Sequence, residues 1–220
     1  MKIKAFFMSS IADIRRDYLL KSLSEKDVDP NAIEQFKTWW NEALLSEIDE
    51  VNAMTLATAS ADALPSARVV LLKGYDENGF IFFTNYESYK AQQIKDNPRA
   101  CLLFFWKELE RQIRITGIIE KISETESEEY FLSRPQGSQI GAWASPQSHV
   151  IESREWLENK VKEVEANFKN KTIARPQNWG GYRVKPIIIE FWQGRESRLH
   201  DRIQYTLGEN NNWVIERLAP

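Results

Sequence analysis

The stretch Arg68-Val69-Val70-Leu71-Leu72-Lys73 places four consecutive branched aliphatic residues between two cations. An uninterrupted apolar run of this kind is typical of a strand buried on both faces, so a strand is predicted over about 66–75. Side chains alternate along a strand, and positions five apart therefore face opposite ways. At about 3.3 Å per residue, the two cations would lie roughly 16 Å apart and could serve two separate anions. The alternative is a core strand whose terminal charges simply reach water.

Patterns on either side of this run predict an antiparallel sheet with flanking helices. Strands are expected over 54–58, 80–84, 99–106, 112–123 and 182–192, and a closing hairpin over 198–207 and 213–217. Helices are expected over 11–22, about 29–48 (starting at Asp29-Pro30), 87–96, 124–133 and 152–170. We predict one α+β domain over residues 1–220, a barrel or curled sheet of roughly seven or eight strands, with residues 1–10 as a loose arm.

The composition limits the classes of function. A net charge of −3 over 220 residues gives no global attraction to nucleic acid or to an anionic membrane, so any anion site must be a local basic cluster. The single cysteine, Cys101, excludes an intrachain disulfide and fits a reducing compartment. No apolar run is long enough to span a bilayer, and one cysteine with two histidines argues against a structural zinc site. A cytoplasmic location is expected.

The familiar phosphate-binding loops are absent from the sequence. Neither G-x-G-x-x-G nor G-x-x-x-x-G-K-[ST] occurs, which argues against a Rossmann dinucleotide site and a nucleotide triphosphatase. A phosphate site in this chain would have to use arginine, lysine and hydroxyl side chains.

The run Arg198-Leu-His-Asp-Arg202 is one candidate for such a site. If it forms a strand, Arg198, His200 and Arg202 share one face, and three cation-capable groups on one face need an anion nearby. Leu199 and Ile203 would then point into the core. The alternative is a strand whose charged face lies in water beside acidic neighbours.

A second candidate lies between two predicted helices. Tyr130 and Arg134 are four residues apart at a helix end and share a face, and Ser138 is expected to cap the next short helix. A phenol, a guanidinium, a hydroxyl and helix-terminal amides together suit a phosphate monoester. Taken alone, the same residues describe a helix end with an ordinary cap.

Several ordered motifs together resemble one family. They are Arg68-Val-Val-Leu-Leu-Lys73, Ser133-Arg-Pro135, Ser138-Gln-Ile-Gly-Ala-Trp143, Phe191-Trp-Gln-Gly194, Arg198-Leu-His-Asp-Arg202 and the terminal Glu216-Arg-Leu-Ala-Pro220. The chain resembles the pyridoxamine/pyridoxine 5′-phosphate oxidases from about Arg15 to Pro220. The resemblance implies an FMN-binding split β-barrel, a homodimer with active sites at the subunit interface, and oxidation of phosphorylated B6 vitamers to pyridoxal 5′-phosphate with O2 as acceptor.

The resemblance also implies roles for individual residues. FMN would be bound by Arg68, Val69, Val70, Leu71, Lys73, Phe83, Thr84, Lys90, Gln112, Gln147, Ser148, Trp192 and Arg202. The substrate phosphate would be bound by Lys73, Tyr130, Arg134 and Ser138, with Arg198 and His200 near the substrate ring as catalytic residues. Arg15 and Tyr18 would form an N-terminal lid.

The chain departs from the family pattern at one position. Ser88-Tyr89-Lys90 stands where the family usually has Ser-Arg-Lys, so Tyr89 replaces an arginine for the FMN phosphate. Tyrosine donates one hydrogen bond but carries no charge, and weaker FMN binding is expected. Two other functions remain open from the sequence: a split-barrel flavin reductase that uses a nicotinamide, and a non-catalytic carrier of FMN or pyridoxal phosphate.

Overall fold

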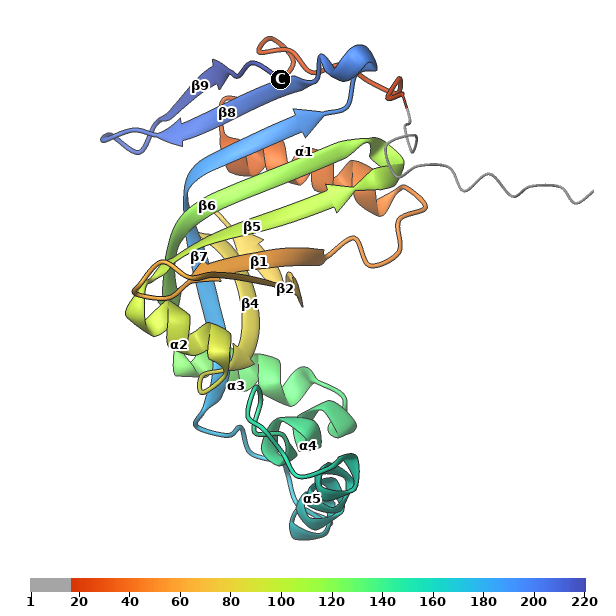
Figure 1. Cartoon of the computed structure of the whole chain (residues 1–220), viewed down its shortest axis with the longest axis vertical. Helices are drawn as coiled ribbons and strands as arrows, with labels where there is room; N and C mark the ends of the chain where they lie inside the picture. Colours follow the sequence, from red (N-terminus) through yellow and green to blue (C-terminus); the bar gives the residue numbers. More distant parts are fainter. Residues whose placement is uncertain (1–16) are drawn as a thin grey trace, which may run out of the picture.

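The architecture is a curled antiparallel sheet with helices on one face and at one end, seen in a computed structural model that describes residues 17–220 (Figure 1). Within that range the strands are β1 Ala53–Ala59, β2 Pro65–Leu71, β3 Gly74–Asp76, β4 Gly79–Asn85, β5 Arg99–Trp106, β6 Arg111–Lys121, β7 Trp179–Gln193, β8 Asp201–Leu207 and β9 Trp213–Arg217. The sheet order is β2-β1-β5-β6-β7-β4-β3, with β8 beside β7 and β9 beside β8. The predicted α+β class and curled sheet are confirmed.

The long strand β7 organises this sheet. Its first half pairs with β4, its second half pairs with β8, and β6 runs along both halves. The β6–β7 register shifts at Thr116/Gly117, where a Cβ on Gly117 would lie 2.2 Å from the Lys185 carbonyl oxygen. Glycine therefore allows the two backbones to approach where the sheet bends. The chain is not a simple meander, because β4 pairs with a strand about 100 residues later rather than with β5.

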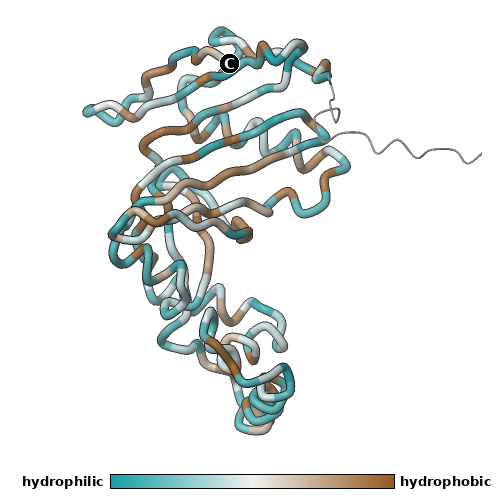
Figure 2. Tube along the Cα trace, viewed as in Figure 1, coloured by the Kyte–Doolittle hydropathy of each residue, from teal (hydrophilic) through white to brown (hydrophobic). Residues whose placement is uncertain are grey.

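Helix α1 (Ala32–Leu44) covers one face of the sheet and closes the main core. The fully buried ring of Phe36 lies 4.8 Å from Phe80 and 5.6 Å from Phe104 between ring centroids. Hydrophobic stretches accordingly follow the strands in Figure 2. The helix begins two residues after the predicted start, because the Asn31 side chain, rather than Asp29, accepts the free N–H groups of the first turn.

Four helices gather at the other end of the sheet (Figure 1): α2 Tyr89–Asp96, α3 Glu124–Ser133, α4 Gln136–Ala144 and α5 Arg154–Asn167. They enclose a smaller apolar cluster built on Phe131, Ile140, Ile173 and Trp179. The bounds of α3 are those predicted, and a capping box of Ser123 and Glu126 fixes its start. No helix between residues 17 and 220 is long and apolar enough to cross a membrane.

The run that was expected to form a doubly buried strand is instead an edge strand. β2 pairs only with β1 and ends at Leu71. Val69 is 69% exposed, and among residues 68–73 only Leu72 is buried. The predicted strand 66–75 therefore divides into β2 and β3, with Lys73 between them. Arg68 and Lys73 do not share a strand, so the prediction that alternation carries them to opposite faces is wrong.

Three local predictions are also wrong. Residues 17–22 are not helical, and the remainder of the predicted helix 11–22 lies outside the described residues. Arg198 belongs to the 3-10 turn η3 (Glu196–Arg198), so it does not share a strand face with Arg202, and Leu199 is 69% exposed. Ser138 lies inside α4, whose cap position is Pro135, although Ile203 is buried as predicted.

Candidate functional site: a basic cavity and a distant aromatic cluster

A cavity of about 570 Å³ opens between β2, β4 and the helices α2 to α4. It brings together most of the residues that the family resemblance pointed to. Arg68, Val69, Val70, Leu71 and Lys73 come from β2 and the residues after it, Phe83 and Thr84 from β4, Lys90 from α2, Tyr130, Arg134 and Ser138 from α3, α4 and the turn joining them, and Gln147 from the loop after α4. Residues more than sixty positions apart therefore line one cavity.

The charge of this cavity is entirely positive. Arg68, Lys73, Lys90 and Arg134 line it, and no aspartate or glutamate does. Within residues 17–220 none of these four cations forms an ion pair with a carboxylate. Four cations gathered without a counter-charge, one of them buried (Lys90) and two half-buried (Arg68 and Arg134), are costly, so the arrangement favours an anionic ligand.

Lys90 and Arg68 stand together on one side of the cavity. The Lys90 ammonium is buried and donates to Thr84 Oγ1 at 3.0 Å and to Gln147 Oε1 at 3.3 Å. Burial, and then the charge of Arg68, lower the pKa of Lys90 to about 8. Arg68 donates to Thr58 Oγ1 at 2.6 Å and to Ser66 Oγ at 2.5 Å, and burial lowers its pKa as well. Neutral oxygens orient both cations without neutralising them.

Arg134 supplies a polar atom that the described residues do not satisfy. Its Nη1 is buried and has no hydrogen-bond partner among residues 17–220. Its guanidinium carbon lies 4.4 Å from the centre of the Trp179 ring, and burial lowers its pKa. A buried guanidinium N–H without an acceptor is satisfied by a ligand oxygen entering the cavity.

A stack of aromatic rings forms one wall of the cavity. Phe83 stacks on Tyr130 at 3.9 Å and on Trp179 at 5.5 Å between centroids. Trp179 is not among the site residues predicted from the sequence, which places it in a loop rather than at the start of β7. The sequence does carry a signal for this position: Trp179 directly precedes Gly180 and Gly181, and paired glycines in a strand indicate close packing of the backbone. In the structure a Cβ at Gly181 would lie 2.4 Å from Ile122.

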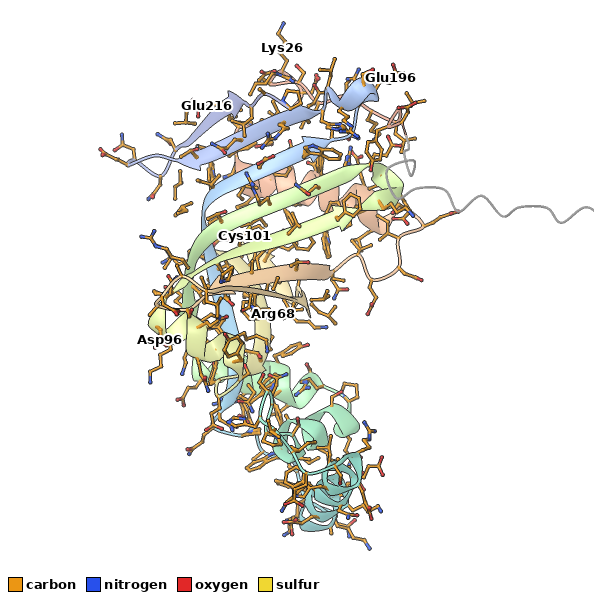
Figure 3. The ribbon with its side chains drawn as sticks, in the orientation of Figure 1. Lys26, Arg68, Asp96, Cys101, Glu196 and Glu216 are labelled. Atoms are coloured by element: carbon orange, nitrogen blue, oxygen red, sulfur yellow. The ribbon has the colours of Figure 1, made fainter. Side chains whose placement is uncertain are left out.

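The remaining predicted residues do not line this cavity. Tyr18, Trp192 and His200 form an aromatic cluster, in which the Trp192 and His200 centroids lie 4.6 Å apart and Tyr18 lies 5.8 Å from Trp192. Gln112, Trp192 and Arg202 are direct cross-strand partners in one row across β6, β7 and β8. In Figure 3 Arg68 lies near the middle of the molecule, whereas Glu196, which opens the turn containing Arg198, lies near the top, away from the helices at the bottom. Ser148 follows Gln147 with a positive φ of 72°, and Arg15 lies outside the described residues.

Two hydrogen bonds orient groups in the aromatic cluster and in the neighbouring row, one at His200 and one at Arg202. The backbone N–H of Arg195 donates to His200 Nδ1 at 3.1 Å, so Nδ1 is an acceptor and the proton of the neutral ring lies on Nε2. Burial and the charge of Arg198 lower the pKa of His200, which favours this neutral form. Arg202 donates to Glu190 Oε1 at 2.8 Å, and this bond raises the pKa of Arg202.

The sheet and its basic cavity place the chain among the α+β split-barrel proteins. PhzG from Burkholderia lata 383, solved in complex with tetrahydrophenazine-1-carboxylic acid, superposes with a TM-score of 0.85 at 30% identity and covers 91% of this chain and 99% of its own. An FMN-binding protein of Nostoc punctiforme, described as related to pyridoxamine 5′-phosphate oxidase, shares the fold with a TM-score of 0.68 at 18% identity, over 84% of this chain and 97% of its own.

Sequence comparison narrows this class to one family. Residues 41–168 match the family described as pyridoxamine 5′-phosphate oxidase, and residues 179–220 match the pyridoxine 5′-phosphate oxidase C-terminal dimerisation region. Pyridoxine/pyridoxamine 5′-phosphate oxidases of Nostoc sp. and Cupriavidus metallidurans are 56% and 55% identical, covering 96% and 97% of this chain and 99% and 100% of their own. The chain belongs to the pyridoxine/pyridoxamine 5′-phosphate oxidase family.

Proposed function

We propose that the chain is an FMN-dependent oxidase that converts pyridoxine or pyridoxamine 5′-phosphate to pyridoxal 5′-phosphate. Oxygen accepts the electrons and leaves as hydrogen peroxide, and the amine substrate also takes up water and releases ammonia. The observation that carries the proposal is the cavity lined by four cations and no carboxylate, with Arg134 Nη1 buried and unsatisfied within residues 17–220. Both the cofactor and the substrate are phosphate monoesters, which this donor set suits.

The cavity has donors for two phosphates on two sides. We assign Arg68, Lys90 and Thr84 to the FMN phosphate, because hydroxyl groups orient the half-buried Arg68 and the buried Lys90 side by side. We assign Lys73, Tyr130, Arg134 and Ser138 to the substrate phosphate. When bound, FMN would accept a hydride from the substrate C4′ carbon and pass the electrons to oxygen.

A homodimer explains why the predicted residues fall into two clusters. The register places Val69, Phe105, Ile118 and Val214 on the sheet face opposite α1, where they are 69%, 53%, 46% and 51% exposed. An exposed apolar face of this kind is typical of a subunit interface. The match of residues 179–220 to a dimerisation region supports the same assembly.

The row of Gln112, Trp192 and Arg202 lies on this same exposed face, because Phe105 is the cross-strand partner of Gln112. In the proposed dimer the row and the Tyr18–Trp192–His200 cluster of one subunit complete the basic cavity of its partner. Arg198 then orients the anionic substrate through its charge. Neutral His200 donates a hydrogen bond from Nε2 to the substrate ring.

The decisive experiment measures oxygen uptake by purified, FMN-loaded protein after addition of pyridoxine 5′-phosphate. The oxidase consumes oxygen and forms an equal amount of hydrogen peroxide without a nicotinamide. Consumption of NADPH without pyridoxine 5′-phosphate would identify a flavin reductase instead, and FMN binding without either reaction would identify a carrier.

Arg198→Met should lower turnover while FMN remains bound; unchanged turnover would remove Arg198 from the mechanism.

A further inference from the structure

We propose that Glu110 is a positioning residue, which fixes residues 17–25 so that the Tyr18 ring covers Trp192 and His200. We call residues 17–25 the strap. This inference rests on the proposed function, in which the Tyr18–Trp192–His200 cluster completes the basic cavity of the partner subunit. None of the roles assigned above includes Glu110.

The backbone at Glu110 indicates that its side chain has a specific role. The residue has φ 53° and ψ 40°, a left-handed conformation that glycine or asparagine adopts more cheaply than glutamate. Its side chain is also buried, with only 2% of the residue exposed. The left-handed backbone and the burial of a carboxylate are each unfavourable for the folded state, so the contacts of Glu110 must compensate for both terms.

Those contacts are with the strap. The Glu110 carboxylate oxygen Oε2 accepts the backbone N–H of Leu19 at 2.8 Å and that of Leu20 at 3.1 Å. Hydrogen bonds from amides to a buried carboxylate are charge-assisted and stronger than those between neutral groups. The strap has no helix or strand of its own at these residues, so side-chain contacts hold it: the two bonds to Glu110 and, one residue farther on, the exposed ion pair of Lys21 with Glu42 at 2.7 Å.

The main chain of Glu110 holds the surface on which Tyr18 rests. Its carbonyl oxygen accepts the Gly194 N–H at 2.7 Å and Gln193 Nε2 at 3.2 Å. A Cβ at Gly194 would lie 2.6 Å from Tyr18 Cγ, so the Tyr18 ring sits directly on the glycine backbone. Glu110 therefore binds both partners of the Tyr18–Gly194 contact: its side chain holds the residues after Tyr18, and its carbonyl oxygen holds Gly194.

The strap has a second anchor farther along. Asp201 Oδ2 accepts the Leu23 N–H at 3.0 Å, and Arg217 donates to the Leu23 carbonyl oxygen at 3.0 Å. This anchor holds the strap five residues beyond Tyr18, and the Lys21–Glu42 ion pair between them is exposed, so Glu110 provides the buried contact nearest to Tyr18. With both anchors in place, the Tyr18 centroid lies 5.8 Å from that of Trp192 and 6.0 Å from that of His200.

The test replaces Glu110 with glycine, which suits the left-handed backbone and removes only the side chain. Hydrogen exchange of the Leu19 and Leu20 amides should accelerate about 10-fold or more in FMN-loaded Glu110→Gly protein. The KM for pyridoxine 5′-phosphate should rise about 3- to 10-fold, with a smaller change in kcat and unchanged FMN affinity. The matched control is Glu50→Gly, because Glu50 is an exposed glutamate with φ 47° that leaves these amides untouched.

Two more variants separate positioning from general destabilisation. Glu110→Gln keeps one acceptor oxygen and should recover part of the amide protection and of the KM. Gly194→Ala should raise the KM by displacing Tyr18, without requiring any change at Glu110. The proposal is overturned if Glu110→Gly leaves amide exchange or the KM at the level of Glu50→Gly. Exchange needs no substrate, so this arm still judges the contact if the wild-type protein fails the oxidase assay.

Discussion

The arginine and lysine residues of the basic cavity and those near the strap differ in how they are neutralised. In the cavity, Lys90 and Arg134 have no carboxylate partner within the described chain. Near the strap, Arg195 and Arg217 bind Asp201 at 3.0 and 2.8 Å, and Arg202 binds Glu190 at 2.8 Å. The first group carries a cost that an anionic ligand removes, whereas the second group is satisfied internally and holds the structure in place.

The largest expected effect comes from removing a cavity charge. Lys90→Met should weaken FMN binding about 100-fold, because a buried ammonium no longer meets the phosphate. The same change should raise the free energy of unfolding of the apoprotein by about 1–3 kcal/mol, since an uncompensated buried charge is gone. FMN titration and urea unfolding at fixed protein concentration measure the two effects. A less stable apoprotein would show that Lys90 is satisfied without a ligand.

Removing a charge near the strap should have the opposite effect on stability. Glu190 is buried and accepts from Arg202 and Arg114, so Glu190→Gln leaves two guanidinium groups without their counter-charge. We expect the free energy of unfolding to fall by about 1–3 kcal/mol. This loss is smaller than that expected for a fully buried ion pair, because both arginine side chains are partly exposed to water. An unchanged urea midpoint would show that the ion pairs near the strap do not stabilise the fold, and would contradict the proposed difference between them and the cavity cations.

A smaller effect should appear in the pH dependence of the apoprotein. The pKa of Lys90 is about 8 in the folded state and about 10.5 when unperturbed. Between these two pH values the unfolded chain holds a proton on Lys90 that the folded chain has lost, so the free energy of unfolding rises with pH. Below about pH 8 the buried ammonium is fully charged, and it then destabilises the folded apoprotein by its full amount. FMN affinity should fall over the same range as the ammonium is lost. Lys90→Met should lack both trends, and identical pH profiles would contradict the assignment.

The smallest effect is expected at the position where the chain departs from its family. Tyr89 is the first residue of α2, is 45% exposed, and lies near enough to Arg68 to offset in part the lowering of the Arg68 pKa by burial. Tyr89→Arg should strengthen FMN binding about 3- to 10-fold, because a solvent-exposed charge gains only modestly from a phosphate. Titration of the apoprotein with FMN measures this, and no gain would count against a role for this position.

Features set by neighbouring residues were predictable from the sequence. The helix 124–133 and the strand 99–106 have the predicted bounds, because a capping box fixes the first and an apolar run between turns fixes the second. The family motifs also led to most residues of the basic cavity, including Arg134 and Lys90.

Features set by distant partners were not predictable. The run 68–73 has the composition of a central strand, but β2 has only one neighbour, and its edge position depends on which strands pair. The spacing of apolar residues predicted a helix over 11–22, yet residues 17–22 are not helical, and hydrogen bonds to Glu110 and Asp201 hold the strap. Trp179 lines the cavity because β7 begins beside β4, a contact across about 100 residues.

The half-buried row of Gln112, Trp192 and Arg202 has a consequence for genetics. In the proposed dimer each active site takes its cavity from one chain and this row from the other. A subunit with a defective cavity and a subunit with a defective row, each inactive as a homodimer, would therefore form a mixed dimer in which one site carries both lesions and the other carries none. Two loss-of-function alleles of this chain would complement each other, restoring up to half of the activity in every mixed dimer.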